Sequence, residues 1–266
     1  MSLFDENGRV LISPSRLKAW VDCPLKWKAV YIDELRYPAS PSMVFGSAIH
    51  KALETFHRGL WCSTPASPDE LLKLFNETLQ EESHPPGSDP LLLDEDEMAK
   101  QAKGLLDLYV SRYGTEKVAA AELSLTTAVI DLATGEDLGA TLVGVIDLIT
   151  SEGTVVDVKT SARTSDLFDL TISHSVQLDA YRYLLHSSGA AAKEMEIRLL
   201  VRTKVPRVEA FQLPAKKSFE SFLSLCRGYV DFVRCMEVPR PRPGIFCGPG
   251  CPAYSQCRAH HGLEVA

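Results

Sequence analysis

Two acidic residues and a lysine interrupt segments that are otherwise apolar, and these side chains could do the chemistry of a bound cation. Asp147 follows the apolar run Gly-Val-Ile, and Asp157 and Lys159 lie two residues apart in the run Val-Val-Asp-Val-Lys-Thr. Because side chains alternate between the faces of a strand, Asp157 and Lys159 would share one face. Paired carboxylates suit Mg²⁺ or Mn²⁺, which could polarise a phosphate while the lysine orients the attacking water.

The loop between these segments decides whether the two carboxylates meet. The sequence Ser151-Glu152-Gly153 suits a three-residue hairpin loop with Gly153 in the left-handed conformation. A loop centred on Glu152 would place Asp147 opposite Asp157, whereas a two-residue loop would put them on different faces. The alternative role of the charges is an internal ion pair, but desolvation makes buried pairs poor stabilisers. Three charges in apolar strands therefore favour a functional metal site.

Four cysteines from opposite ends of the sequence could hold a second metal centre: Cys23, Cys247, Cys251 and Cys257. The chain has 7 cysteines, and this odd number fits a reducing compartment with a metal site better than a disulfide framework. The other three, Cys62, Cys226 and Cys235, are expected to be unliganded core thiols. Zinc is one candidate for the centre, since Cys₄ and Cys₃His sites are common and His260 and His261 lie close by.

Bulk properties exclude some classes of protein. The 266 residues contain no apolar stretch near the ~20 residues that cross a bilayer, and no signal-peptide pattern, so we expect a cytoplasmic protein without a membrane partner. The net charge of −7 argues against a broad basic surface, although not against a local basic groove. The basic residues Arg16, Lys18, Lys26 and Lys28 could bind backbone phosphate in such a groove, although charged runs are mostly solvated surface.

The first part of the chain is expected to be helical, and strands with two further helices are expected after it. The predicted helices span residues 14–31 (interrupted near Pro24), 44–60, 68–82, 95–113, 173–186 and 216–236; the predicted strands span residues 118–130, 139–150, 154–161, 195–203 and 208–213. The linker that contains Pro38 and the stretch 84–90 are expected to be loops. We therefore expect an α/β fold with a helical region (1–115), a core (116–238) and a Cys-rich tail (239–266) without regular structure.

An ordered set of motifs resembles the PD-(D/E)XK nucleases, as found in RecB-type and Cas4-type exonucleases. Its members are Gly46-Ser-Ala-Ile-His50, Gly144-Val-Ile-Asp147, Asp157-Val-Lys159-Thr160, Gln177-Leu-Asp-Ala-Tyr181, and the segment from Ser13 through Cys23-Pro-Leu-Lys-Trp. The resemblance implies a PD-(D/E)XK core. It also implies that Asp147, Asp157 and His50 bind metal, that Lys159 is the catalytic lysine, and that Glu122, Gln177 and Tyr181 complete the site.

The same resemblance implies a cofactor and a substrate. Four cysteines in this arrangement would hold a [4Fe–4S] cluster, although three residues separate Cys247 from Cys251 where two are commonest, which leaves the cluster type open. The implied activity is hydrolysis of DNA, on single strands or DNA ends, in repair, recombination or CRISPR adaptation, with a helicase or CRISPR-adaptation protein as a possible partner. The alternative is a DNA-binding or assembly subunit with little or no hydrolytic activity.

Overall fold

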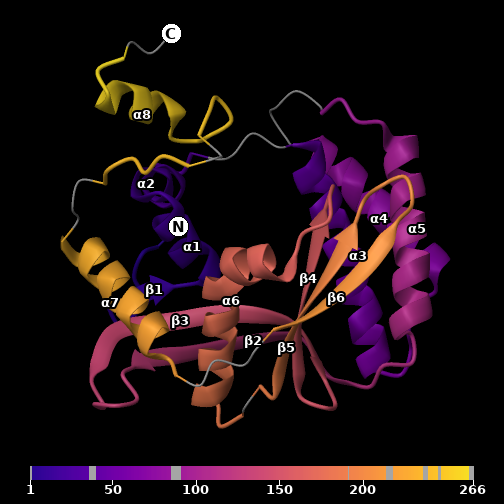
Figure 1. The fold of residues 1–266 in the computed structure, drawn as a ribbon, viewed down its shortest axis with the longest axis horizontal. Helices are drawn as coiled ribbons and strands as arrows, with labels where there is room; N and C mark the ends of the chain where they lie inside the picture. Colours follow the sequence, from indigo (N-terminus) through magenta and orange to yellow (C-terminus); the bar gives the residue numbers. More distant parts are fainter. Residues whose placement is uncertain are drawn as a thin grey trace.

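A computed structural model describes residues 2–35, 40–84, 91–190, 192–213, 218–235, 239–244 and 247–263. A mixed sheet lies at the centre, with helices α3, α4 and α5 gathered on one side and α1, α2, α6 and α7 on the other (Figure 1). The mixed α/β fold predicted from the sequence is confirmed. No helix in the described ranges is long and apolar enough to span a membrane.

The N-terminal segment contains one short strand and two short helices. Strand β1 (Val10–Ile12) leads into α1 (Pro14–Asp22), where Ser13 accepts a hydrogen bond from the backbone N–H of Arg16 and so caps the helix. Helix α2 (Pro24–Tyr31) follows at once. Cys23 between them is extended, because a residue before proline is disfavoured in the helical conformation. The predicted interruption near Pro24 is confirmed, whereas β1 was not predicted.

Helices α3 (Pro41–Trp61), α4 (Pro68–Ser83) and α5 (Glu95–Tyr113) form the helical layer. Each has a proline or acidic residues in its first turn and a side-chain cap, from Ser40, Ser67 and Asp94 respectively. Their apolar faces bury Phe45, Phe56 and other side chains against strands β4 and β5. The predicted helices are correct here, except that α3 begins three residues earlier. Part of the predicted loop 84–90, and Pro38, lie outside the described residues.

The sheet has the order β1-β3-β4-β5-β6, with β2 paired to β3 as well. Its strands are β2 (Val118–Ile130), β3 (Asp137–Thr150), β4 (Thr154–Ser161), β5 (Glu194–Val201) and β6 (Arg207–Leu213). The pairs β1–β3 and β4–β5 are parallel, and the other pairs are antiparallel. Parallel β4 and β5 require a crossover, and α6 supplies it. All five predicted strands are present.

Helices α6 (Leu167–Ser187) and α7 (Glu220–Cys235) cover the face of the sheet opposite α3. Helix α6 begins six residues before the predicted start, because Asp166 caps it by accepting a hydrogen bond from the backbone N–H of Asp169. The predicted ends of the last core helix, Lys216 and Met236, lie outside the described residues. Gly144 permits close packing here, since a Cβ at this position would lie 2.8 Å from Cδ1 of Leu184.

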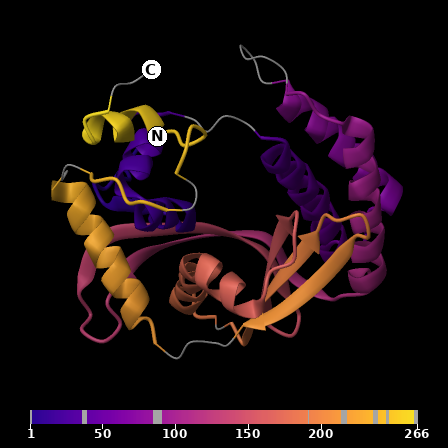
Figure 2. The same ribbon diagram turned by 45° about the horizontal axis from the view of Figure 1, so that its top comes forward.

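The tail contains helix α8 (Tyr254–His260), so the prediction of a tail without regular structure was wrong. The helix is short, and it packs through Ala253 onto Leu25 and Ala29 of α2. Apolar periodicity cannot reveal such an element, because its 7 residues are fewer than the about 11 over which a helical period can be recognised. In both views α8 lies beside the N-terminal helices (Figure 2).

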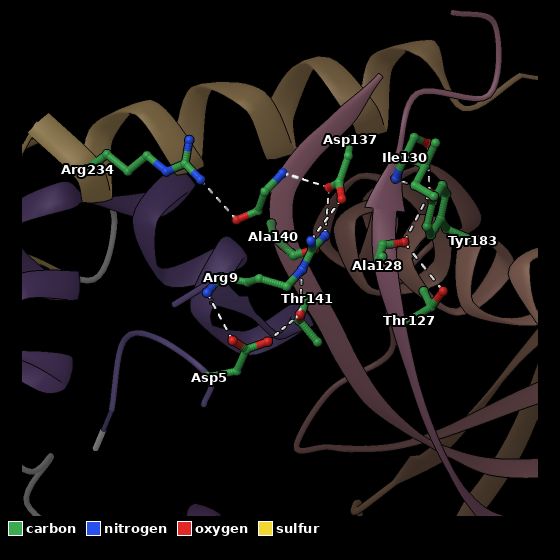
Figure 3. A network of polar contacts seen from close by, with 11 residues as sticks. Asp5, Arg9, Thr127, Ala128, Ile130, Asp137, Ala140, Thr141, Tyr183 and Arg234 are labelled. Carbon is green, nitrogen blue, oxygen red and sulfur yellow. Dashed lines mark hydrogen bonds and ion pairs between the residues drawn. The ribbon is translucent and has the colours of Figure 1, made fainter. Parts of the chain in front are cut away.

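A polar network fastens β1 to the beginning of β3 (Figure 3). The guanidinium of Arg9 forms two hydrogen bonds with Asp137, of 2.8 and 2.6 Å, and a third with the carbonyl of Ala140. Asp5 accepts a hydrogen bond of 2.7 Å from the hydroxyl of Thr141. These contacts join residues more than a hundred positions apart, so they fix where the N-terminal helices lie on the core.

Candidate active site

Strands β3 and β4 separate at the position where the two acidic residues stand. Their ladder pairs Ile149 with Val155 and Leu148 with Val156, and the left-handed Gly153, with a φ of 90°, turns the loop. Continued by one step, this register places Asp147 opposite Asp157. The three-residue loop is therefore confirmed, and the alternative register is excluded.

A side chain replaces the backbone ladder beyond that point. Oδ2 of Asp147 accepts a hydrogen bond of 2.9 Å from the backbone N–H of Val158. Strand β3 then continues between β1 and β2, while β4 continues beside β5. The divergence of the two strands leaves room for polar groups between them, which a fully paired sheet would not provide.

Asp157 is the most deeply buried charged side chain of the site, with no exposed surface. Its Oδ1 accepts hydrogen bonds from Nζ of Lys159, at 2.8 Å, and from Nε2 of Gln177, at 2.9 Å. Gln177 also donates to the hydroxyl of Tyr181, at 2.7 Å. Gln177 and Tyr181 lie one helical turn apart on α6, so both side chains face β4. The structure thus brings four of the predicted residues into one chain of contacts.

The second oxygen of Asp157 is buried and has no hydrogen-bond donor among the described residues, although Nζ of Lys159 lies 2.8 Å away. Burial raises the pKa of Asp157, Lys159 opposes that rise, and the neighbouring Asp147 adds to it. A buried carboxylate oxygen without a hydrogen bond is costly unless another group completes its environment. A divalent cation is the group that fits, because it would stabilise both carboxylates at once.

His50 reaches the site from α3. Gly46, one turn earlier, lets α3 approach β4 closely, since a Cβ there would lie 3.0 Å from Oγ1 of Thr160. Burial lowers the pKa of His50. Asp147 opposes this shift, and Lys159 adds to it. The imidazole is therefore neutral at pH 7, and the neutral form is the one that binds metal ions.

Glu122 lies directly across from Asp147 in the register of β2 and β3. Its backbone is left-handed, with a φ of 51°, which is strained for a residue other than glycine. The pKa of Glu122 is raised to about 7 by burial and by the negative charges of Asp147 and Glu54. The positive charges of Arg58 and Lys51 partly oppose this rise. The carboxyl of Glu122 thus lies close enough to Asp147 and Glu54 for both to raise its pKa, whereas an ordinary edge-strand glutamate would point to solvent.

Two residues near the site were not found by sequence reasoning. Glu54 follows His50 by one turn of α3 and forms ion pairs with Lys51 and Arg58, both at 3.0 Å. His174 precedes Gln177 by three residues on α6. In both cases a spacing of three or four from a predicted residue was the available signal, but spacing alone is common on helices.

The candidate metal ligands do not form a ready-made coordination site. Among the described residues, no three His, Cys, Asp or Glu side chains lie close enough together to hold an ion as they stand. The donors are of the right chemical type, with two carboxylates and a neutral imidazole, and one buried oxygen has no hydrogen bond. The residues therefore fit a cation that draws them together on binding.

The four cysteines converge although they come from opposite ends of the chain. Cys23, Cys247, Cys251 and Cys257 line one cavity of about 640 Å³, together with Arg242 and other residues. Burial and the three other thiols raise the pKa of Cys257. Backbone N–H groups of Arg242 and Gly244 donate to the sulfurs of Cys23 and Cys247, at 3.3 and 3.2 Å.

The tail is held on the N-terminal helices by contacts that involve no thiol. Arg242 donates a hydrogen bond to the carbonyl of Val21 at the end of α1. Gln256 on α8 donates to Asp33, at 2.8 Å, and Asp33 also pairs with Lys28. Three thiols of the tail are thereby gathered around Cys23.

The other three cysteines are not all core residues. Cys226 is buried, as predicted, and burial raises the pKa of its thiol. Cys62 and Cys235 are exposed at the ends of α3 and α7, so the prediction of core thiols was wrong for them. Both stand at a helix end, and helix periodicity does not define such end positions well.

Comparisons with known proteins place this geometry in a family. A model of the PD-(D/E)XK nuclease superfamily matches residues 11–258. The fold is similar to the crystal structure named "Putative exonuclease" from Eubacterium rectale, with a TM-score of 0.60 and 14% identity, over 96% of this chain and 90% of that one. The crystal structure named SSO0001 is 13% identical with a TM-score of 0.35, over 81% of this chain and 86% of that one.

A comparison with curated proteins gives no match. The family model nevertheless spans nearly the whole chain, from β1 to α8, and it includes each of the residues that meet between β3, β4 and α6. This chain therefore belongs to the PD-(D/E)XK nuclease superfamily.

Proposed function

We propose that this protein is a Mg²⁺- or Mn²⁺-dependent deoxyribonuclease of the RecB/Cas4-like type that acts on single strands or DNA ends. The observation that carries the proposal is the environment of Asp157. A fully buried carboxylate with one oxygen that accepts no hydrogen bond, beside a lysine, is expensive for folding. Such a cost is typical of catalytic centres, where perturbed groups gather.

The proposed roles follow from the contacts. Asp147, Asp157 and His50 would hold the cation, and Glu122 lies close enough to Asp147 to adjust the charge of the group. When bound, a divalent cation would offset the charge of the scissile phosphate and lower the pKa of the attacking water. Lys159 lies 2.8 Å from Asp157, where its ammonium can hold the water or the phosphate oxygen.

Two residues of α6 position the reacting groups. Gln177 donates to Asp157 and to Tyr181, so its amide fixes the orientation of the carboxylate. Burial raises the pKa of Tyr181 far above its ordinary value, with Asp157 adding to the rise. Tyr181 therefore stays protonated, and its hydroxyl can donate a hydrogen bond to a substrate oxygen.

The four cysteines are proposed to hold a [4Fe–4S] cluster. A zinc ion draws its sulfur ligands to about 2.3 Å, whereas a cluster spreads four thiolates around a larger body. The thiols line one cavity of about 640 Å³, which offers room for a body of that kind. Backbone N–H donors to two of the sulfurs are a further feature of cluster sites.

The biological setting is inferred more broadly. A role in DNA repair, recombination or CRISPR adaptation, with a helicase or CRISPR-adaptation protein as partner, rests on the resemblance of the motifs. A location in the cytoplasm rests on the 7 cysteines, which suit a reducing compartment. A DNA-binding subunit without hydrolytic activity is disfavoured, because such a subunit has no use for the buried set of Asp157, Lys159 and Gln177.

The test is a cleavage assay on end-labelled single-stranded DNA with Mn²⁺, Mg²⁺ or a chelator. We expect cleavage with either metal and none with the chelator. A closed circular single strand in parallel distinguishes cutting from ends from internal cutting. Binding of DNA without cleavage under every metal condition, by protein with a full complement of iron, would support the non-hydrolytic subunit and overturn the proposal.

A further inference from the structure

A groove of about 540 Å³ extends from the candidate active site toward the N-terminal helices. Gln177 and Tyr181 belong to both, so the groove begins at the catalytic residues. Its other walls are the start of α1 and the strands β2 and β3; they are formed by Ser13, Pro14, Ser15, Lys18, Ser124, Val143, Gly144 and Val145. Val145 of β3 is 45% exposed, so the strand is open to solvent at this position.

The chemistry of the groove suits an anion. None of its lining residues is acidic, although the whole chain has a net charge of −7. The lining offers three serine hydroxyls, the amide of Gln177, the hydroxyl of Tyr181 and one lysine. An extended polyanion could lie there without meeting a carboxylate.

His174 lies on α6, close enough to Lys159 of the candidate active site and to Lys18 of the groove for both lysines to influence its pKa. It lies three residues before Gln177 on α6, and α1 packs against this helix. Burial, Lys159 and Lys18 lower its pKa to about 4, so the imidazole is neutral at pH 7 and lies within the field of both lysines. It forms no hydrogen bond within the described part of the chain, and a neutral imidazole can donate one N–H.

Lys18 can exchange its present partner for a ligand. Its ammonium pairs with Asp22, at 3.1 Å, and the two side chains are 45% and 37% exposed. An exposed pair of this kind contributes little to stability, so a phosphate can replace the carboxylate at little cost. Lys26 also lies 3.8 Å from Asp22, which keeps that carboxylate paired when Lys18 moves.

We propose that Lys18 and His174 form a phosphate-binding subsite that holds the substrate strand beside the phosphodiester to be cut. The inference rests on the proposed nuclease function and deepens it, because it names the part of the substrate that the groove receives. Lys18 supplies charge, and His174 supplies a neutral hydrogen-bond donor next to Lys159. Both are positioning residues. The bound phosphate belongs either to the backbone within the strand or to a strand end.

The first experiment measures DNA binding by fluorescence anisotropy in chelating buffer, where no strand is cut. For a single strand, each phosphate neutralised by a cation changes the slope of log K against log salt by about 0.7. We expect Lys18→Ala to lower the slope by about that amount. His174→Ala should weaken binding several-fold with no change of slope, and His174→Gln, which keeps a donor, should regain part of the affinity.

Controls separate this subsite from a general loss of charge or fold. Lys73→Ala removes an exposed lysine on α4 that pairs with Glu77, and should leave affinity and slope unchanged. Melting temperatures of the Lys18 and His174 variants should stay near that of the wild type. In the cleavage assay both variants should raise KM more than they lower kcat, because the strand is held less well while the metal ligands are intact.

The two sources of phosphate are distinguished by the substrate. If the Lys18→Ala effect is equal for circular single strands and linear ones, the subsite binds backbone phosphate; if it requires a phosphorylated end, the subsite binds a terminal phosphate. Unchanged slope and affinity in both variants, with a wild type that binds and cleaves DNA, would overturn the subsite alone. A wild type that neither binds nor cleaves would overturn the proposed function instead.

Discussion

The side-chain amide of Gln177 donates a hydrogen bond of 2.9 Å to Oδ1 of Asp157 and thereby joins helix α6 to strand β4. These residues are 20 positions apart, and the crossover that makes β4 and β5 parallel brings α6 back over the strand. The contact leaves Oδ2 without a hydrogen bond from the described residues, and the ammonium of Lys159 lies 2.8 Å from that oxygen. Catalytic geometry therefore depends on how α6 is seated.

Removal of the buried carboxylate or its lysine should abolish cleavage. We expect Asp157→Ala and Lys159→Ala each to lower the cleavage rate by orders of magnitude, because each removes a group that positions the cation or the reacting oxygen. Circular dichroism and DNA affinity should remain close to wild type. Lys73→Ala, on the exposed surface of α4, serves as the control for lysine removal. Most of the wild-type rate in purified Asp157→Ala would sink the assignment.

His50 should influence which metal the enzyme prefers. A nitrogen ligand among oxygens favours Mn²⁺ over Mg²⁺, and Ca²⁺ should bind without supporting turnover. His50→Ala is expected to weaken the apparent metal affinity and reduce the Mn²⁺ preference, with little change in melting temperature. Activity titrated against each metal measures this. Identical titration curves for wild type and variant, accompanied by a lower melting temperature, would show that His50 only packs against the core.

The four-cysteine centre should contain iron. Protein purified without oxygen is expected to be brown, with broad visible absorption and about four irons per chain. Cys23→Ser should lose the colour as completely as Cys251→Ser, whereas Cys62→Ser, at an exposed thiol outside the cavity, should keep it. Both colourless variants should also melt at a lower temperature. One zinc per chain with negligible iron in anaerobic preparations would favour the zinc alternative.

Gly144 is required by the close approach of α6 to β3. A Cβ at this position would lie 2.8 Å from Cδ1 of Leu184, whose side chain is buried and cannot move aside freely. Gly144→Ala should therefore cost about 1–3 kcal/mol of unfolding free energy, as overpacking does. Denaturant melts measure it. Because α6 carries Gln177, we also expect slower cleavage; Gly135→Ala, in open space but left-handed, should lose stability without this catalytic effect.

His57 should make the protein sensitive to acid. It is 1% exposed, and burial, with Arg198 and His50 adding, lowers its pKa to about 3. The unfolded chain takes up a proton below the ordinary value of 6.5, and the folded chain does not until about 3, so stability falls as the pH drops through this window. His57→Phe removes the imidazole that binds this proton in the unfolded chain.

Denaturant melts at pH 7 and pH 4.5 check the effect. His57→Phe should be less stable than wild type at pH 7, because the hydrogen bond of 2.9 Å to Tyr109 is lost. At pH 4.5 the wild type should lose about 2–3 kcal/mol more than the variant does, since each unit of separation is worth about 1.4 kcal/mol. Equal losses in the two proteins would mean that His57 is protonated in the folded state.

Local patterns in the sequence determined most elements and part of the site. The strands that carry Asp157 and Lys159 were predictable, because alternation and turn residues are local properties. The common face of these two side chains, and that of Gln177 and Tyr181, followed from strand and helix periods alone. The capping serines and Pro24 fixed where the first helices begin and end.

Tertiary structure decided which residues far apart in the sequence meet, because local patterns carry no information about such contacts. Glu122 has a left-handed backbone where β2 runs beside Asp147, and His174 comes under the influence of Lys18 because α1 and α6 meet. The register of β3 and β4 was left open by the sequence, since two loop lengths were possible. Cys23 meets the tail through contacts such as Gln256 with Asp33, which depend on closing a loop of more than two hundred residues. Such meetings follow from the packing of the whole sheet, which alternation and helix periodicity do not specify.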